Sequence, residues 1–134
     1  MGKAAAQEVA DRICNLLEGK AEINMIFAAA PSQEEFLHHL ISDQRINWNR
    51  INAFHMDEYI GLLPDAPQSF GNFLRIRIFD KVPFKNVYYL NGHATDLEEE
   101  CTRYTSLLSQ FPTDIVCLGI GENGHIAFND PDVA

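Results

Sequence analysis

The sequence predicts an α/β protein with an open, mainly parallel β-sheet and helices on both faces. Short apolar runs of strand length alternate along the chain with segments whose apolar residues recur at helical spacing. Such an alternation implies crossover connections, which join parallel strands and place helices against the sheet. The 134 residues suit one domain, without internal repeats or long linkers.

The first half of the chain is predicted to contain two helices and two strands. Residues 4–18 place four aliphatic side chains on one side of a helix. Residues 23–28 form a short apolar strand. Ser32 then begins the sequence Ser-Gln-Glu-Glu, a capping-box pattern that predicts the start of the next helix. Residues 50–56 are predicted to be the second strand.

The second half repeats this alternation. A loop rich in glycine and proline, residues 61–67, precedes a helix that we expect Ser69 to cap. Residues 87–90 are the third predicted strand. A second capping box, Thr95-Asp-Leu-Glu98, predicts the start of an acidic helix. Residues 115–118 are the fourth predicted strand.

Composition excludes several classes of function. Hydrophobic residues make up 46% and charged residues 22%, an ordinary balance for a globular protein. The net charge of -9 repels phosphate backbones and anionic lipids, so we expect no nucleic-acid partner and no membrane association. The cysteines are odd in number, far apart and set in apolar patterns, which predicts buried thiols in a cytoplasmic protein: Cys14, Cys101 and Cys117.

The loop after the fourth strand is the first candidate for an active site. It contains Asn123, His125 and Asp130 within a glycine-rich stretch that begins at Gly121. Loops at the carboxyl ends of strands are where open α/β sheets place ligands, and a histidine can carry a proton near neutral pH. The glycines formally match G-x-G-x-x-G, but the Asn-Asp-Pro sequence that follows argues against the helix which a dinucleotide site requires. We therefore expect Gly121 and Gly124 to form tight turns beside a small ligand.

A pair of carboxylates follows the second strand. Asp57 and Glu58 are adjacent, so their side chains point in different directions and only one would face a shared cleft. The structural alternative is that Asp57 caps the following turn while Glu58 is solvated. His55 lies two residues before Asp57 and can support it from the same side of the strand.

The turn after the first strand is a third candidate. Ala29, Ala30 and Ser32 are small enough to let an anion approach the helix amides. Glu34 and Glu35 follow at once and favour the alternative of a plain capped helix. The histidines show no metal-binding spacing and no C-x-x-C pair is present, so we expect no metal.

Two motifs carry a family resemblance: Phe54-His-Met-Asp-Glu-Tyr-Ile-Gly61, and Leu118-Gly-Ile-Gly-Glu-Asn-Gly-His-Ile-Ala-Phe-Asn-Asp-Pro131. Together with Ser69-Phe70, Leu90-Asn-Gly92 and Glu100-Cys-Thr-Arg-Tyr104, they resemble the glucosamine-6-phosphate deaminase (isomerase) family. The resemblance runs in order over most of the chain. The related 6-phosphogluconolactonases have a similar glycine-histidine loop, but its continuation differs.

The resemblance implies ring opening of an amino-sugar phosphate, proton transfer between carbon 2 and carbon 1, and release of ammonia to give a ketose phosphate. By motif match, Asp57 would be the base, His125 would assist ring opening and Asp130 would orient His125. Asp130 stands where the family usually has Glu, and Asn123 stands where some members have Asp. The resemblance implies no cofactor, because the substrate's own carbonyl stabilises the carbanion.

The expected partner is a small phosphorylated amino sugar. We expect it to be bound by Ala29, Ala30, Ser32, Glu58, Gly121 and Gly124. Full-length family members continue past this point, so we expect an incomplete portion of a longer catalytic domain that is inactive alone. Homo-oligomer formation stays open. Other readings are a galactosamine-6-phosphate isomerase, a 6-phosphogluconolactonase-like enzyme and a sugar-phosphate-sensing domain without turnover.

Overall fold

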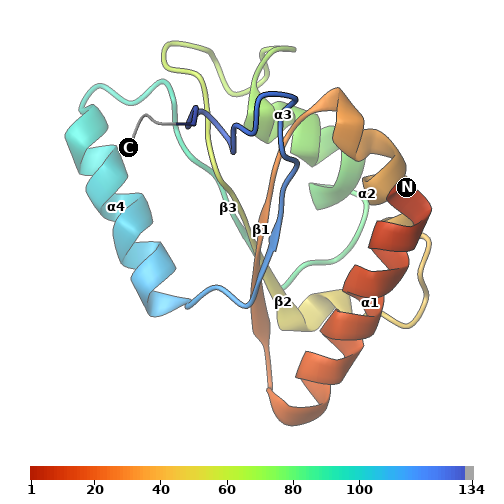
Figure 1. Ribbon diagram of the computed structural model, residues 1–134. Helices are drawn as coiled ribbons and strands as arrows, with labels where there is room; N and C mark the ends of the chain where they lie inside the picture. The colour runs from red at the N-terminus through yellow and green to blue at the C-terminus, as the bar shows by residue number, and fades with distance from the viewer. Residues whose placement is uncertain (132–134) are drawn as a thin grey trace.

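The computed structural model describes residues 1–131 and contains four α-helices and four β-strands in that range (Figure 1). Along the chain these are α1 (Gly2–Gly19), β1 (Ile23–Phe27), α2 (Glu34–Ile41), β2 (Ile51–His55), α3 (Phe70–Leu74), β3 (Asn86–Tyr88), α4 (Leu97–Gln110) and β4 (Ile115–Cys117). A π-helical turn, Arg75–Phe79, continues α3. Short 3-10 turns precede α2 and β2, at Pro31–Gln33 and Trp48–Arg50.

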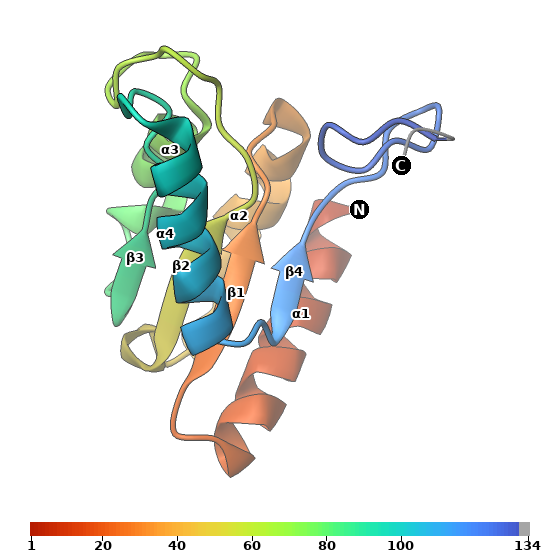
Figure 2. The same ribbon diagram turned by 90° about the vertical axis from the view of Figure 1, so that its left-hand side faces the viewer.

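The sheet has the strand order β3-β2-β1-β4, and each neighbouring pair is parallel. Helices α1, α2 and α3 lie on one face and α4 lies on the other, as the two views show (Figures 1 and 2). The predicted fold class, a parallel sheet with helices on both faces, is therefore confirmed. No helix within residues 1–131 is long and apolar enough to cross a membrane.

The strand order reverses at β1. The chain builds outward from β1 to β2 and β3, and then returns so that β4 pairs with the other side of β1. The loops that leave β1 and β4 therefore diverge at the carboxyl edge of the sheet. In open α/β sheets this reversal point is where a crevice for ligands forms.

The hydrophobic core lies mainly between the sheet and α1, α2 and α3. Helix α1 contributes Ile13, α2 contributes Leu40, and Leu74 of α3 and the adjacent Ile78 are also fully buried. On the opposite face, Tyr104 is the buried residue that α4 supplies. Its ring lies edge-on against Phe54 of β2, with the centroids 5.8 Å apart. The two faces of the sheet are thus covered unequally.

The predicted helix starts are correct at one position and wrong at two. The Ser69 hydroxyl caps α3 by accepting the Asn72 N–H at 3.2 Å. Ser32 does not cap α2, because Pro31 opens a 3-10 turn that takes up Ser32 before the α-helix begins. The fourth helix is capped by Asp96 in place of Thr95, with the Asp96 carboxylate accepting the Glu99 N–H at 3.1 Å.

The prediction of three buried thiols is also wrong. Cys117 is buried in the core, Cys14 is half-buried and Cys101 is exposed. Cys101 lies on α4, whose one buried residue is Tyr104. The other side chains of α4 stay accessible because no second helix packs beside it within the described residues. All three thiols are free.

A ladder of asparagine side chains sets the register of three strands. Asn24 of β1 lies opposite Asn52 of β2, which lies opposite Asn86 of β3. The Asn52 amide donates to the Asn24 side-chain oxygen, and the Asn86 amide donates to the Asn52 oxygen, each at 2.9 Å. Buried polar groups are costly when unpaired, so a shift of one residue at either pair of strands would break the asparagine hydrogen bond of that pair.

Tyr104 connects α4 to the carboxyl ends of two strands. Its hydroxyl accepts the His55 N–H at 3.0 Å and lies 2.9 Å from the Tyr88 carbonyl, to which it donates. We predict that Tyr104→Phe lowers the free energy of unfolding by about 1–3 kcal/mol, because it leaves a buried N–H without an acceptor. Urea denaturation measures this change.

Tyr88→Phe is the matched control, because the Tyr88 hydroxyl makes no hydrogen bond within the described residues while its ring packs on Phe54 at 5.1 Å. Equal stability of the Tyr104 variant and this control would show that the hydroxyl does not hold the strand ends.

Candidate active site

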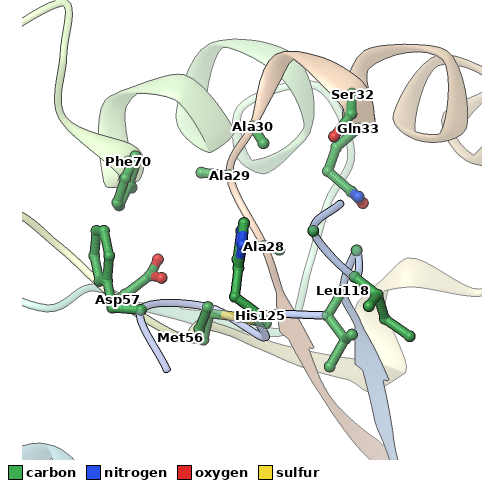
Figure 3. A pocket seen from close by; sticks show the side chains of 15 residues that line it. Ala28, Ala29, Ala30, Ser32, Gln33, Met56, Asp57, Phe70, Leu118 and His125 are labelled. Atoms are coloured by element: carbon green, nitrogen blue, oxygen red, sulfur yellow. The ribbon is translucent and has the colours of Figure 1, made fainter. Parts of the chain in front are cut away.

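A cavity of about 210 Å³ lies at the point where the strand order reverses. Its walls come from the segments that follow β1, β2 and β4, together with the start of α3 (Figure 3). The lining residues are Ala28, Ala29, Ala30, Ser32, Gln33, Met56, Asp57, Phe70, Leu118, Gly119, Ile120, Gly121, His125, Ala127 and Phe128. Two of the three loops thus supply a side chain that can exchange protons, Asp57 and His125.

Asp57 and His125 face the same space. Figure 3 shows the carboxylate of Asp57 and the ring of His125 directed into the cavity from the β2 and β4 loops. The Asp57 carboxylate accepts no hydrogen bond from residues 1–131. Burial, and secondarily the negative charge of Glu58, raises the pKa of Asp57 above its usual range. A carboxylate in such surroundings is a stronger base than one in water.

His55 holds the backbone of Asp57 from below. The imidazole is buried, and its Nε2 accepts the Leu90 N–H at 3.0 Å. Since the proton of the neutral ring is then on Nδ1, this nitrogen donates to the Asp57 carbonyl at 3.0 Å. Burial lowers the pKa of His55, which favours this neutral form. His55 therefore contacts the main-chain carbonyl of Asp57 and not the Asp57 carboxylate.

His125 is oriented by Asn123. The Asn123 side-chain oxygen lies 2.7 Å from Nδ1 of His125 and also accepts the His125 backbone N–H at 3.1 Å. The oxygen is an acceptor, so Nδ1 carries the proton and Nε2 is the nitrogen left to act. The Asn123 amide lies 3.4 Å from the Asp130 carboxylate. Asp130 thus reaches His125 through Asn123 and does not line the cavity.

Two glycines shape the His125 loop. A Cβ on Gly121 would lie 1.9 Å from Cε1 of His125, so the imidazole can lie there only because residue 121 has no side chain. Gly124 has a φ of 87°, in the left-handed region that favours glycine, and its N–H donates to the Gly121 carbonyl at 2.9 Å. No helix begins between Gly119 and Pro131, so the loop lacks the helix of a dinucleotide site.

The turn after β1 contributes the small residues that were predicted to bind an anion. Ala29, Ala30 and Ser32 line the cavity. The two following glutamates point elsewhere: Glu34 pairs with Arg77 at 2.6 Å, and Glu35 accepts the Gly2 N–H at 3.4 Å. Neither glutamate lines the cavity, and no Lys or Arg of residues 1–131 does so. The described residues therefore offer amide and hydroxyl groups to an anion. They offer no positive charge that would balance it.

Glu58 is placed apart from the other predicted substrate-binding residues. Its carboxylate lies at the N-terminus of α3, and Glu58 lines a separate cavity together with residues of α3 and of the segment after β3. Gly124 also lies outside the main cavity. The alternative in which Asp57 caps the following turn and Glu58 is solvated therefore does not hold. Glu58 accepts the first two N–H groups of α3, whose N-cap is Ser69, and Asp57 faces the cleft.

Sequence reasoning missed an aromatic wall. The sequence analysis assigns no site role to Phe70 or Phe128, but both line the cavity. Their rings lie 5.9 Å apart, and each packs on Tyr59, at 4.7 Å and 5.9 Å. The sequence did contain a signal for this wall, since all three aromatic residues lie within the motifs that carry the family resemblance. Residues 1–131 contain no group of three side chains able to hold a metal ion.

Comparisons with known proteins show the family to which the chain belongs. Residues 1–128 match the family of glucosamine-6-phosphate isomerases and 6-phosphogluconolactonases. A glucosamine-6-phosphate deaminase of Bacillus cereus is 46% identical over 87 residues, which are 65% of this chain and 33% of that protein. One of Listeria innocua is 40% identical over 110 residues, which are 82% of this chain and 47% of that protein.

Solved structures show the same fold. A monomeric glucosamine-6-phosphate deaminase superimposes with a TM-score of 0.83 at 33% identity, over 98% of this chain and 55% of that one. A 6-phosphogluconolactonase from Thermotoga maritima gives a TM-score of 0.82 at 26% identity, over 95% and 59% of the two chains. The chain spans half or less of the length of the curated relatives named above. It belongs to the glucosamine-6-phosphate isomerase/6-phosphogluconolactonase family.

Proposed function

We propose that this protein is an amino-sugar phosphate deaminase/isomerase, which converts glucosamine 6-phosphate to fructose 6-phosphate and ammonia. The observation that supports it most is the shared cavity, where the Asp57 carboxylate and the His125 imidazole face the same space. A base and a second proton-transfer group at one small cavity are what aldose–ketose isomerisation requires. The names of the deaminases that this chain resembles support the same reaction.

In this proposal Asp57 moves the proton between carbon 2 and carbon 1. The reaction needs a base that is ionised at neutral pH and still binds a proton well. A half-buried carboxylate without hydrogen-bond donors meets both needs, since its pKa is raised by burial and by Glu58. The proton returns to carbon 1 from the same carboxyl group, which leaves an imine at carbon 2. A water molecule then adds to carbon 2, and the C–N bond breaks to release ammonia and leave the ketone.

His125 opens the sugar ring in this proposal. Asn123 holds the proton on Nδ1, so Nε2 can accept the proton of the carbon 1 hydroxyl and deliver it to the ring oxygen. Asp130 stabilises the arrangement through the Asn123 amide. No cofactor takes part, because the open-chain substrate supplies its own electron sink.

Lactone hydrolysis is the second candidate. The lactonase from Thermotoga maritima superimposes almost as well as the deaminase, so the fold alone does not separate the two reactions. Sequence identity favours the deaminases, at 46% and 40% in the curated relatives named above. Measuring both ammonia release and 6-phosphogluconolactone hydrolysis on the same protein decides between them.

The three free cysteines are consistent with a reducing, cytoplasmic setting.

We predict that Asp57→Asn lowers kcat for ammonia release from glucosamine 6-phosphate by about 10²- to 10⁴-fold, because an amide cannot accept the proton. The assay uses the longest form of the protein that the gene encodes. Binding of the sugar phosphate, followed by calorimetry, should persist because Asn is nearly isosteric. Asp65→Asn, on an exposed side chain of the loop between β2 and α3, is the control. Unchanged turnover in the Asp57 variant would remove Asp57 from the mechanism.

The same substitution should stabilise the fold at neutral pH. The folded-state pKa of Asp57 lies above its unfolded value, so folding favours the protonated form. That contribution is present at acidic pH and is lost as the pH rises through the folded pKa. We therefore expect Asp57→Asn to exceed the wild type in unfolding free energy at pH 7, with the difference shrinking toward pH 4. Urea titrations at several pH values measure this difference, and a constant one would contradict the assignment.

For the 134 residues alone we predict substrate turnover below detection. The cavity contains no Lys or Arg from the described residues, so nothing there balances the charge of a sugar phosphate. Ammonia release is measured on this chain beside a longer form of the protein. Turnover by the 134 residues would show that their own amides and Ser32 suffice to hold the phosphate.

A further inference from the structure

The two adjacent carboxylates after β2 have opposite surroundings. The Glu58 carboxylate accepts four hydrogen bonds, from the Ser69 hydroxyl at 2.7 Å and from the N–H groups of Tyr59, Phe70 and Gly71, each at 2.9 Å. The Asp57 carboxylate accepts none from residues 1–131. Carboxylates satisfied by several N–H groups at a helix start are held firmly in one position. One acid of the pair is therefore anchored, and its neighbour is left free to react.

Close packing around Glu58 leaves the loop little freedom. A Cβ added to Gly71 would come within 3.2 Å of the Glu58 carboxylate, and one added to Gly92 would lie 2.1 Å from the Tyr59 carbonyl. The Gly61 N–H also donates to the Gly92 carbonyl at 2.8 Å. The β2 loop thus lies between α3 and the segment after β3, with glycines where the backbones approach most closely.

We propose that Glu58 is a positioning residue for Asp57: by fastening the β2 loop to the first N–H groups of α3, it leaves Asp57 as the carboxylate that faces the cavity. This inference rests on the proposed function, since it assigns Glu58 a part in the work of the base. Below the loop, His55 fixes the Asp57 carbonyl. The Glu58 side chain and the Asp57 carbonyl are thus both held by hydrogen bonds, and between them the Asp57 carboxylate faces the cavity.

The charges of the pair support this division of roles. Burial alone would raise the pKa of Glu58, but the hydrogen bonds from Gly71, Ser69, Phe70 and Tyr59 lower it overall. Burial and the charge of Glu58 raise the pKa of Asp57. The other titratable groups near Asp57 are the neutral His55 below it and His125 across the cavity. Neighbouring acids whose pKa values are pushed apart are typical of an acid–base site.

NMR on the 134-residue chain tests the proposal without substrate. The variants are Glu58→Gln and, as a matched control, Glu98→Gln, which removes the same charge from an exposed side chain of α4. In Glu58→Gln we expect the pKa of Asp57, read from its carboxyl carbon, to fall toward the ordinary aspartate value. The amides of Phe70 and Gly71 should exchange roughly tenfold faster or more, because each loses a charged acceptor. The control should match the wild type in both readouts.

Glu58→Asp separates the charge from the fastening. It keeps a negative charge beside Asp57 but is one methylene too short to reach α3, so we expect fast exchange at Phe70 and Gly71 with a smaller fall in the Asp57 pKa. This variant decides the question if the Gln variant does not fold. Equal Asp57 titration in Glu58→Gln and Glu98→Gln, or unchanged amide exchange in Glu58→Asp, would overturn the proposal. Absence of ammonia release from the unsubstituted protein in its longest form, with both NMR readouts as expected, would instead overturn the proposed function.

Discussion

The pairing of β4 with β1 is the constraint on which the site depends. Had the last strand continued outward beside β3, its loop would lie at the far end of the sheet from the turn after β1. The chain instead returns, so β4 aligns with β1 over three residue pairs and ends at the same edge. The loops after β1, β2 and β4 then meet around one cavity. Because side chains in parallel strands are fixed by register, this pairing decides which loop residues can face one another.

The loops after β1, β2 and β4 contribute differently to the cavity. The β1 turn is made of small residues and offers space, whereas the β2 loop is tied on two sides through His55 and Glu58 and supplies Asp57. The β4 loop is shaped by glycines and carries its own orienting amide, Asn123, for His125. Aromatic rings of Phe70 and Phe128 close the gap between the last two loops. Rigid placement of Asp57 and His125 suits the proposed proton transfers, since proton transfer works only within hydrogen-bond range.

The sequence predicts the fold class and the four strands, because strand periodicity is a local pattern. It also predicts that Asp57 and His125 share one edge of the sheet, because each follows a parallel strand at its carboxyl end. The direction of each carboxylate could not be predicted in this way. One of the two carboxylates, Glu58, accepts the first N–H groups of α3. Which of the two does so depends on the distance between α3 and the loop after β2, and tertiary packing sets that distance. Ser32 failed as a cap for a local reason, since Pro31 starts a 3-10 turn first. The asparagine ladder and the Tyr104 hydroxyl bonds join residues 16 to 49 positions apart, and no local pattern indicates them.

A crystal structure of the longest form of the protein with fructose 6-phosphate bound would test the central claim most directly. The account predicts the sugar in the cavity between the β1, β2 and β4 loops, with an Asp57 oxygen about 2.6–3.2 Å from a group on carbon 1 or carbon 2, in hydrogen-bond range. His125 should face the same end of the open-chain sugar, with Glu58 still bound to α3. A sugar bound elsewhere, or an Asp57 carboxylate turned toward α3 in the place of Glu58, would contradict it.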